Sequence, residues 1–137
     1  MALLDVNALV ALAWDSHIHH LRIKEWFLEH ADSGWQTCPV TESGFVRVSA
    51  NPKVLPQPID VGSARLVLES LKQAGAHRFL VDDVSITDRE FPEIQGYRQV
   101  TDAHLLSIAR KNSKPLLTFD AGIGDLADNG EVILLTT

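Results

Sequence analysis

Short apolar runs alternate with amphipathic helical patterns along the whole chain. Strands are predicted where the runs are short and bounded by turn residues, and helices where apolar residues recur at helical spacing. The predicted strands are residues 2–4, 35–40, 79–81, 115–119 and 131–136. The predicted helices are residues 7–14, 17–30, 41–50, 60–74 and 101–111, with a short helical turn at 88–93. This alternation predicts an α/β fold: a mostly parallel five-stranded sheet flanked by helices on both faces.

Particular residues predict where the helices end and which faces they bury. Thr41 and Thr101 are expected to cap the helices that begin with them, and Gly75 is expected to stop the helix that precedes it. The helix at 17–30 is expected to bury one apolar stripe made of Ile18, Leu21, Trp26, Phe27 and Leu28.

The composition fits one self-sufficient domain. The chain has 137 residues, of which 45% are hydrophobic, and a chain of this size buries roughly two-thirds of its unfolded surface. The predicted domain spans residues 1–137. The longest apolar stretch, residues 8–14, is far below the ~20 residues that cross a bilayer, and Cys38 is the single cysteine. We therefore expect a cytoplasmic protein with no membrane segment and no disulfide.

Four acidic residues stand at the ends of predicted elements. Asp5 and Asp120 directly follow strands, and ligand sites in parallel α/β sheets lie beyond the carboxyl ends of the strands. Glu42 and Asp102 open predicted helices, where the helix dipole alone favours a negative side chain. Each acid taken singly is explained as well by a capping role. Together they can converge on one crevice, where a cation would relieve their mutual repulsion.

The charge of the chain limits the partners that this crevice can serve. A net charge of −6 argues against binding a polyanion through overall attraction. Clustered carboxylates, however, hold divalent cations that present positive charge to phosphate. Oxygen ligands suit Mg²⁺ or Mn²⁺, and such ions acidify bound water and polarise phosphorus. The acids therefore favour metal-dependent phosphodiester hydrolysis.

The segments around these acids resemble the motifs of the PIN-domain family. Its motifs are matched in order by residues 3–12 (LLDVNALVAL), 41–47 (TESGFVR), 101–105 (TDAHL) and 117–120 (LTFD). Residues 51–54 and 79–83 resemble the VapC-type toxins of bacterial toxin–antitoxin pairs. One departure is Val6, which stands where the family often has a small or hydroxyl residue. The resemblance spans nearly the whole chain.

This resemblance implies a metal-dependent endoribonuclease that hydrolyses RNA with a metal-activated water and acts as the toxin of a toxin–antitoxin module. It implies that the catalytic residues, which also ligate Mg²⁺ or Mn²⁺, are Asp5, Glu42, Asp102 and Asp120. Asn7 and Thr118 would assist them by hydrogen bonding. The implied partners are an RNA substrate, such as transfer or ribosomal RNA, a cognate antitoxin protein, and a second copy of the chain in a homodimer.

Other residues that could carry chemistry have ordinary structural explanations. The three histidines of residues 17–20 are expected on a solvated helix face, although His17 and His20 share a helical spacing that would suit a metal. The large aromatic residues are expected to pack in the core or against a partner rather than on bases: Trp14, Trp26, Phe27 and Trp35.

Four residues near the acidic motifs keep two interpretations each. His104 is either a hydrogen-bonding partner at the site or a simple helix residue. Asp82 and Asp83 either join the acidic pocket or cap the turn to Val84, and the cap is favoured. Asp125 is either an outer carboxylate of the site or the polar side of a short helix.

Rival classes of protein are less compatible with the residues. A receiver-like phosphoacceptor domain needs a lysine at the carboxyl end of a strand, whereas Lys114 precedes its strand. A haloacid-dehalogenase-like phosphatase would need a second aspartate where Asn7 stands. No phosphate-binding glycine loop follows a strand, which disfavours a nucleotide-binding module. A catalytically silent binding domain on the same fold remains an alternative.

Overall fold

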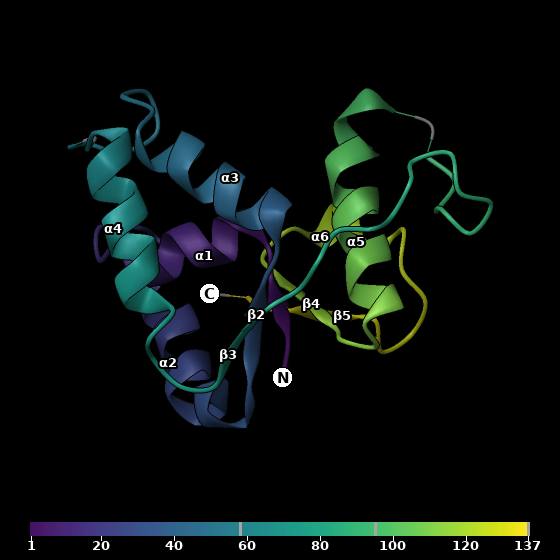
Figure 1. Cartoon of the computed structure of the whole chain (residues 1–137), viewed down its shortest axis with the longest axis horizontal. Coiled ribbons are helices and arrows are strands. Elements are labelled where there is room, and N and C mark those ends of the chain that lie inside the picture. Colours follow the sequence, from purple (N-terminus) through teal and green to yellow (C-terminus); the bar gives the residue numbers. More distant parts are fainter. Residues whose placement is uncertain (58, 95, 137) are drawn as a thin grey trace.

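The computed structural model describes residues 1–57, 59–94 and 96–136. The strands are β1 (Leu3–Leu4), β2 (Trp35–Thr37), β3 (His77–Phe79), β4 (Leu116–Thr118) and β5 (Val132–Leu134). The helices are α1 (Val6–Ala13), α2 (His20–His30), α3 (Pro39–Ser49), α4 (Val61–Leu71), α5 (Val100–Lys111) and α6 (Ala121–Gly124). Two 3₁₀ helices lie at Ala31–Ser33 and Tyr97–Gln99. Strands and helices alternate as predicted (Figure 1).

The strands form one sheet in the order β3-β2-β1-β4-β5, and every pair is parallel. The predicted mostly parallel five-stranded sheet is therefore confirmed. A receiver-like sheet has the order 2-1-3-4-5 instead, so the topology rejects the phosphoacceptor alternative.

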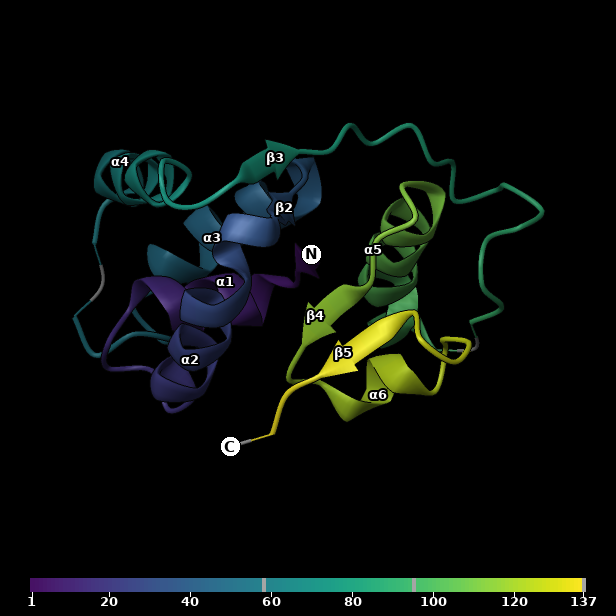
Figure 2. The ribbon, with the colours of Figure 1, turned by 90° about the horizontal axis from the view of Figure 1, so that it is seen from below.

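Helices cover both faces of this sheet, with α1 to α4 on one side and α5 and α6 on the other (Figures 1 and 2). Side chains alternate between the faces because successive residues of a strand point in opposite directions. Leu4 and Leu117 join the core beneath α1 to α4, whereas Leu3 and Leu116 join the core beneath α5 and α6. The predicted two-sided packing is confirmed.

The apolar stripe predicted for α2 was wrong in part. Ile18, Leu21 and Leu28 are 82%, 79% and 75% exposed. The helix begins at His20, later than expected, and it turns Ile23 and Trp26 into the core instead. The large aromatic residues do pack in the core as predicted, where Phe27 meets Trp35 edge to face.

Several predicted boundaries also move. Helix α3 begins at Pro39, and Thr41 stabilises its start from within the first turn by accepting a hydrogen bond from the backbone N–H of Cys38. Helix α5 continues from the 3₁₀ helix at Tyr97–Gln99, so Thr101 lies inside it and is not its cap. Strand β3 ends at Phe79 rather than beginning there, and residues 88–93 form turns instead of a helix.

Gly75 turns the chain from α4 into β3. Its φ of +62° is in the left-handed region that glycine adopts without strain. A β-carbon there would also stand 2.6 Å from the carbonyl oxygen of Ala31. Helix α4 ends at Leu71, so the predicted stop lies a few residues beyond the helix itself.

Among the described residues, no helix is long and apolar enough to cross a membrane.

Candidate functional site

Asp5 occupies the carboxyl end of β1 and caps α1. Its side chain is 6% exposed and accepts two hydrogen bonds, from the backbone N–H of Val6 at 2.7 Å and from Thr118 Oγ1 at 2.8 Å. Burial raises the pKa of Asp5, the two hydrogen bonds oppose that rise, and Asp120 adds to it. The carboxylate is thus held in one orientation at the edge of the sheet.

Asp120 occupies the equivalent position at the end of β4 and caps α6. Its Oδ1 accepts a hydrogen bond from the backbone N–H of Gly122 at 2.8 Å. Its own backbone N–H donates to Thr118 Oγ1 at 3.0 Å. Thr118 is fully buried and therefore links the two aspartates, donating to one and accepting from the other.

Asp102 reaches the same place from the first turn of α5. The pKa of Asp102 rises to about 6, first because the side chain is partly buried and then because Asp5 and Asp120 are negatively charged neighbours. The structure therefore brings three of the four predicted acids together, from β1, β4 and α5.

Glu42 is directed elsewhere in this structure. Its Oε2 lies 2.8 Å from Lys72 Nζ and accepts a hydrogen bond from Thr37 Oγ1 at 2.7 Å. His77 Nε2 lies 2.8 Å from the same hydroxyl oxygen, which has already given its proton to Glu42 and so accepts from the imidazole. The predicted gathering of four acids thus involves three here, with Glu42 paired to Lys72 at the end of α4.

The two residues predicted to assist lie beside the aspartates. Thr118 forms the link described above. Asn7 is exposed in the first turn of α1 and lines a pocket with Asp120. Its amide is therefore accessible next to the site.

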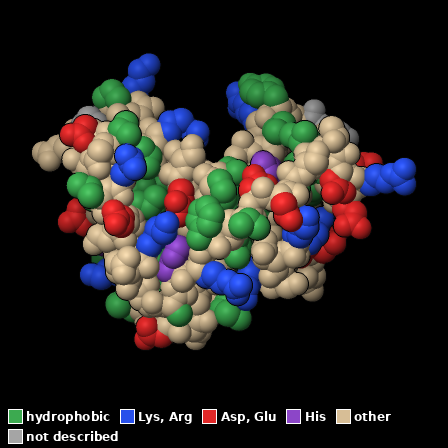
Figure 3. Space-filling model, in the orientation of Figure 1, with side chains coloured by type: hydrophobic (Ala, Val, Ile, Leu, Met, Phe, Trp, Pro, Cys, Tyr) green, Lys and Arg blue, Asp and Glu red, His purple; other side chains and the backbone are tan. Residues whose placement is uncertain are grey.

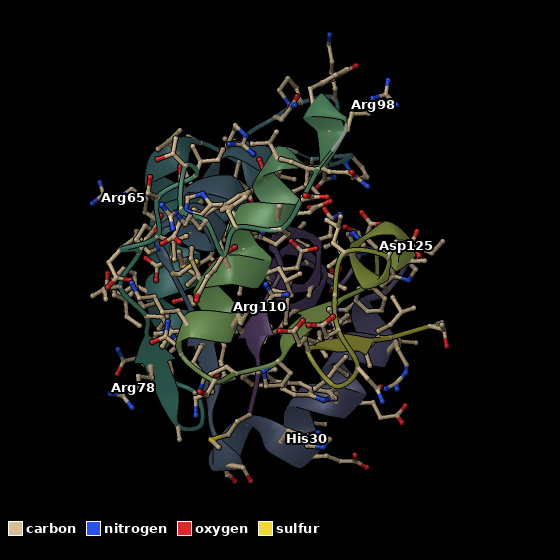
Figure 4. The ribbon with its side chains drawn as sticks, turned by 90° about the vertical axis from the view of Figure 1, so that its right-hand side faces the viewer. His30, Arg65, Arg78, Arg98, Arg110 and Asp125 are labelled. Carbon is tan, nitrogen blue, oxygen red and sulfur yellow. The ribbon has the colours of Figure 1, made fainter. Side chains whose placement is uncertain are left out.

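Of the four residues with two interpretations, His104, Asp82 and Asp83 have partners other than the three aspartates. His104 Nε2 lies 3.0 Å from Asp82, whose Oδ1 also accepts from the backbone N–H of Val84, as expected of a turn cap. Asp83 pairs with Lys111 at 3.1 Å. Asp125 is exposed at the end of α6, and Figure 4 shows it at the edge of the molecule.

The donor set of the three aspartates fits a hard divalent cation. All the donor atoms are carboxylate oxygens, which Mg²⁺ and Mn²⁺ prefer. Burial is the main cause of the raised pKa of Asp102, and a cation would offset the repulsion from Asp5 and Asp120 that adds to it. Among the described residues, no group of three or more acidic, histidine or cysteine side chains is close enough to hold an ion by itself. Mg²⁺ typically keeps several waters and is bound by only one or two carboxylates, so water would supply part of the coordination of such an ion.

A hollow opens beside the site between the lobe of α3 and α4 and the lobe of α5 (Figure 3). A pocket there is lined by Val6, Pro39, Val40, Ser43, Arg47 and Thr101. These residues come from the starts of α1 and α5 and from α3. Arg98 extends from the chain just before α5, at the top of Figure 4. Of these two arginines, Arg47 lines the pocket and supplies positive charge inside the hollow.

Sequence reasoning missed three residues next to Asp120. His17 and His19 precede α2 instead of lying on a solvated helix face, and the His19 ring stacks on Phe119 with centroids 4.2 Å apart. All three line one pocket with Asn7 and Asp120. The available signal was Phe119 itself, an aromatic residue directly before a predicted site aspartate.

Comparisons with known proteins agree with this fold. The PIN domain family model matches residues 2–129. The chain is 66% identical over 127 residues to "Ribonuclease VapC38" of Mycobacterium tuberculosis (strain ATCC 25618 / H37Rv), covering 93% of this chain and 90% of that protein. It is 39% identical to "Ribonuclease VapC39" of the same strain, covering 98% and 99%. The chain therefore belongs to the PIN-domain family, in its VapC group, as its motifs indicated.

Proposed function

We propose that the protein is a metal-dependent endoribonuclease that hydrolyses RNA and acts as the toxin of a toxin–antitoxin module in the cytoplasm. The observation that carries the proposal is the convergence of Asp5, Asp102 and Asp120 at the carboxyl edge of the sheet, with the pKa of Asp102 at about 6. Three carboxylates that repel one another are stabilised by binding a cation. The relatives named as ribonucleases support RNA as the substrate.

The proposed cofactor is Mg²⁺ or Mn²⁺, held by Asp5, Asp102 and Asp120 directly or through water. A bound divalent cation supplies a more acidic water and positive charge that polarises the phosphate. The protein itself holds the carboxylates of Asp5 and Asp120 in position through hydrogen bonds. Thr118 fixes the Asp5 carboxylate and the backbone of Asp120 with one hydroxyl group, so neither must reorganise when substrate arrives.

Glu42 and Asn7 complete the proposed set. Glu42 joins the site in this proposal only after its carboxylate turns away from Lys72 and Thr37. Asn7 has an exposed amide beside Asp120, and this amide can donate a hydrogen bond to a phosphate oxygen. Arg47, which lines the hollow, supplies the attraction to RNA that a net charge of −6 does not.

The remaining partners belong to the same proposal. They are a transfer or ribosomal RNA substrate, a small cognate antitoxin protein, and a second copy of the chain in a homodimer. Expression of the protein should arrest growth, and co-expression of the antitoxin should relieve the arrest. The competing proposal is a catalytically silent PIN-fold module that binds RNA without cutting it.

The decisive experiment incubates the purified protein with a structured RNA pool and Mg²⁺ or Mn²⁺, and resolves the products at single-nucleotide resolution. Asp5→Asn removes one proposed ligand, and Asp125→Asn is the matched control at an exposed aspartate outside the cluster. We expect cleavage by the wild type and by Asp125→Asn, and none by Asp5→Asn or with EDTA. Binding without cleavage in every sample would favour the silent module, and equal cleavage by Asp5→Asn would reject the site.

A further inference from the structure

A second pocket includes Asp120, one of the three aspartates, in its lining. Its lining comes from the first turn of α1, from the turn that precedes α2, and from the end of β4. The lining residues are Asn7, His17, Ile18, His19, Phe119 and Asp120. Because Asp120 belongs to both the pocket and the proposed metal site, a group held in this pocket adjoins the reacting centre.

One wall of the pocket is aromatic. The His19 ring lies parallel to the Phe119 ring, with an angle of 8° between their planes. The His17 ring stands next to them, with its centroid 5.6 Å from that of His19. Ile18 adds an apolar side chain that is 82% exposed. Flat aromatic and apolar surfaces of this kind accept the face of a nucleobase.

His17 adds a directed hydrogen-bond donor. The backbone N–H of His19 donates to His17 Nδ1 at 3.0 Å, so the proton of a neutral imidazole must be on Nε2. Burial first, and then the neighbouring His19 and His20, lower the pKa of His17, which favours the neutral ring. A neutral donor recognises a carbonyl oxygen or ring nitrogen of a base, whereas a cation would be suited to phosphate.

We propose that this pocket is a nucleobase subsite, which holds the base of the nucleotide adjoining the scissile phosphate. The inference rests on the proposed function for its substrate, RNA. The base packs against the aromatic wall, His17 Nε2 donates to an acceptor on its edge, and the Asn7 amide offers a donor and an acceptor nearby. The subsite would make cleavage depend on the base beside the cut, while the aspartates act on a phosphate that every nucleotide shares.

The test measures binding separately from cleavage. Short fluorescein-labelled oligoadenylate and oligouridylate are titrated with the protein in EDTA, with fluorescence anisotropy as the readout. An abasic ribose-phosphate chain of equal length serves as the probe that lacks bases. We expect the wild type to bind at least one base-bearing probe more tightly than the abasic chain by about tenfold or more, the effect of one hydrogen bond and a stacking contact.

Two variants, each with a control variant, locate the effect. His17→Ala should lose the preference for bases and leave binding of the abasic chain unchanged, whereas His30→Ala, at the far end of α2, should keep the preference. Ile18→Asp and its control Leu21→Asp change side chains that are 82% and 79% exposed, so neither should unfold the protein. Ile18→Asp should weaken binding of the base-bearing probe more than Leu21→Asp does.

Each outcome separates the subsite from the nuclease activity. Equal binding of base-bearing and abasic probes by the wild type would reject the subsite, as would an equal loss for both probes in His17→Ala. The same oligonucleotides are then incubated with Mn²⁺ and their products are resolved. Base-dependent binding without cleavage would keep the subsite and count against the nuclease. Cleavage without base-dependent binding would keep the nuclease and reject the subsite.

Discussion

Val6 packs so closely on Gly44 that a β-carbon at Gly44 would stand 2.5 Å from Val6 Cγ2. The contact joins α1, which follows Asp5, to α3, which carries Glu42. Val6 is also the position at which the chain departs from the usual PIN-domain motif. The larger side chain is accommodated here because its neighbour across the helix pair has no side chain at all.

This contact predicts that Gly44→Ala destabilises the protein. Overpacking of a tight core contact costs about 1–3 kcal/mol, more than the helix gains by replacing glycine with alanine. Urea unfolding should show the loss, and adding Val6→Ala in the same chain should recover most of it. Gly62→Ala is the control, since a β-carbon there meets only Asp60 Oδ1 at an ordinary 3.4 Å. A stable Gly44→Ala would contradict the predicted close packing.

Thr118→Val should weaken metal binding at the site, although valine has nearly the same shape as threonine. The substitution leaves Asp5 Oδ2 without its donor and the backbone N–H of Asp120 without its acceptor. Loss of these buried partners should cost about 1–3 kcal/mol of unfolding free energy. The pKa of Asp5 should rise further, because the Thr118 hydrogen bond lowers it.

Calorimetric titration with Mn²⁺ checks the effect of Thr118→Val on the site. We expect Mn²⁺ to bind more weakly at neutral pH, because protons compete better with the ion for a carboxylate whose pKa is higher. Thr118→Ser keeps the hydroxyl group and should restore the affinity. Thr136→Val, at an exposed position after β5, controls for the loss of a hydroxyl group in general. Unchanged Mn²⁺ affinity in Thr118→Val would show that the hydroxyl does not organise the site.

The raised pKa of Asp102 predicts that the free energy of unfolding decreases as the pH rises. Its pKa is raised from 3.8 to about 6 in the folded protein, so between these values the folded state binds more protons than the unfolded state. Folding stability must then decrease with increasing pH across this window. Above pH 6 Asp102 is ionised in the folded protein, and the free energy of unfolding is lower by the full amount. This amount is about 1 kcal/mol after allowing for solvent screening of a partly exposed group.

Asp102→Asn therefore should stabilise the metal-free protein near pH 7 and make little difference near pH 4. Urea unfolding in EDTA at the two pH values measures this, with Asp125→Asn as a control that should change neither value. Mn²⁺ should stabilise the wild type more than Asp102→Asn, because the ion binds the ionised carboxylate. If Asp102→Asn were less stable than the wild type at pH 7 without metal, the predicted cost of ionising the partly buried Asp102 beside two other carboxylates would be wrong.

The sequence predicts the order of strands and helices well because most of the strands are marked by a short apolar run. Leu3-Leu4 and Leu116-Leu117 are short apolar runs ending near aspartates, and both became parallel strands with an acid at the carboxyl end. Parallel pairing alone then brings Asp5 and Asp120 to one edge. This part of the site could be predicted because it depends on strand ends rather than on side-chain conformation.

Other features depend on tertiary contacts that no local pattern contains. The pairing of Glu42 with Lys72 joins two helices and could not be read from either segment. The start of α2 at His20 rather than residue 17 decides that His17 and His19 lie in a turn beside Phe119. A shift of less than one helical turn therefore separates a solvated histidine face from the wall of a pocket.

Lys72→Met tests whether Glu42 can join the aspartates. The lysine holds the Glu42 carboxylate at 2.8 Å and also lies over the Phe79 ring, a contact that the apolar methionine side chain can keep. Without the cation, Thr37 alone retains Glu42, so the carboxylate is freer to turn toward a metal ion. We expect Mn²⁺ to bind about threefold more tightly, while loss of the partly exposed ion pair should cost no more than about 1 kcal/mol of stability.

The affinity of Lys72→Met is compared with that of Lys24→Met, which removes an equal charge from an exposed position of α2. Both variants make the chain more acidic and should attract Mn²⁺ slightly through the overall field. An additional gain in Lys72→Met alone, abolished by adding Glu42→Gln, would assign the gain to the released carboxylate. Equal affinities for the two lysine variants would mean that Glu42 stays on Thr37 when the ion binds, so that the aspartates hold it without Glu42.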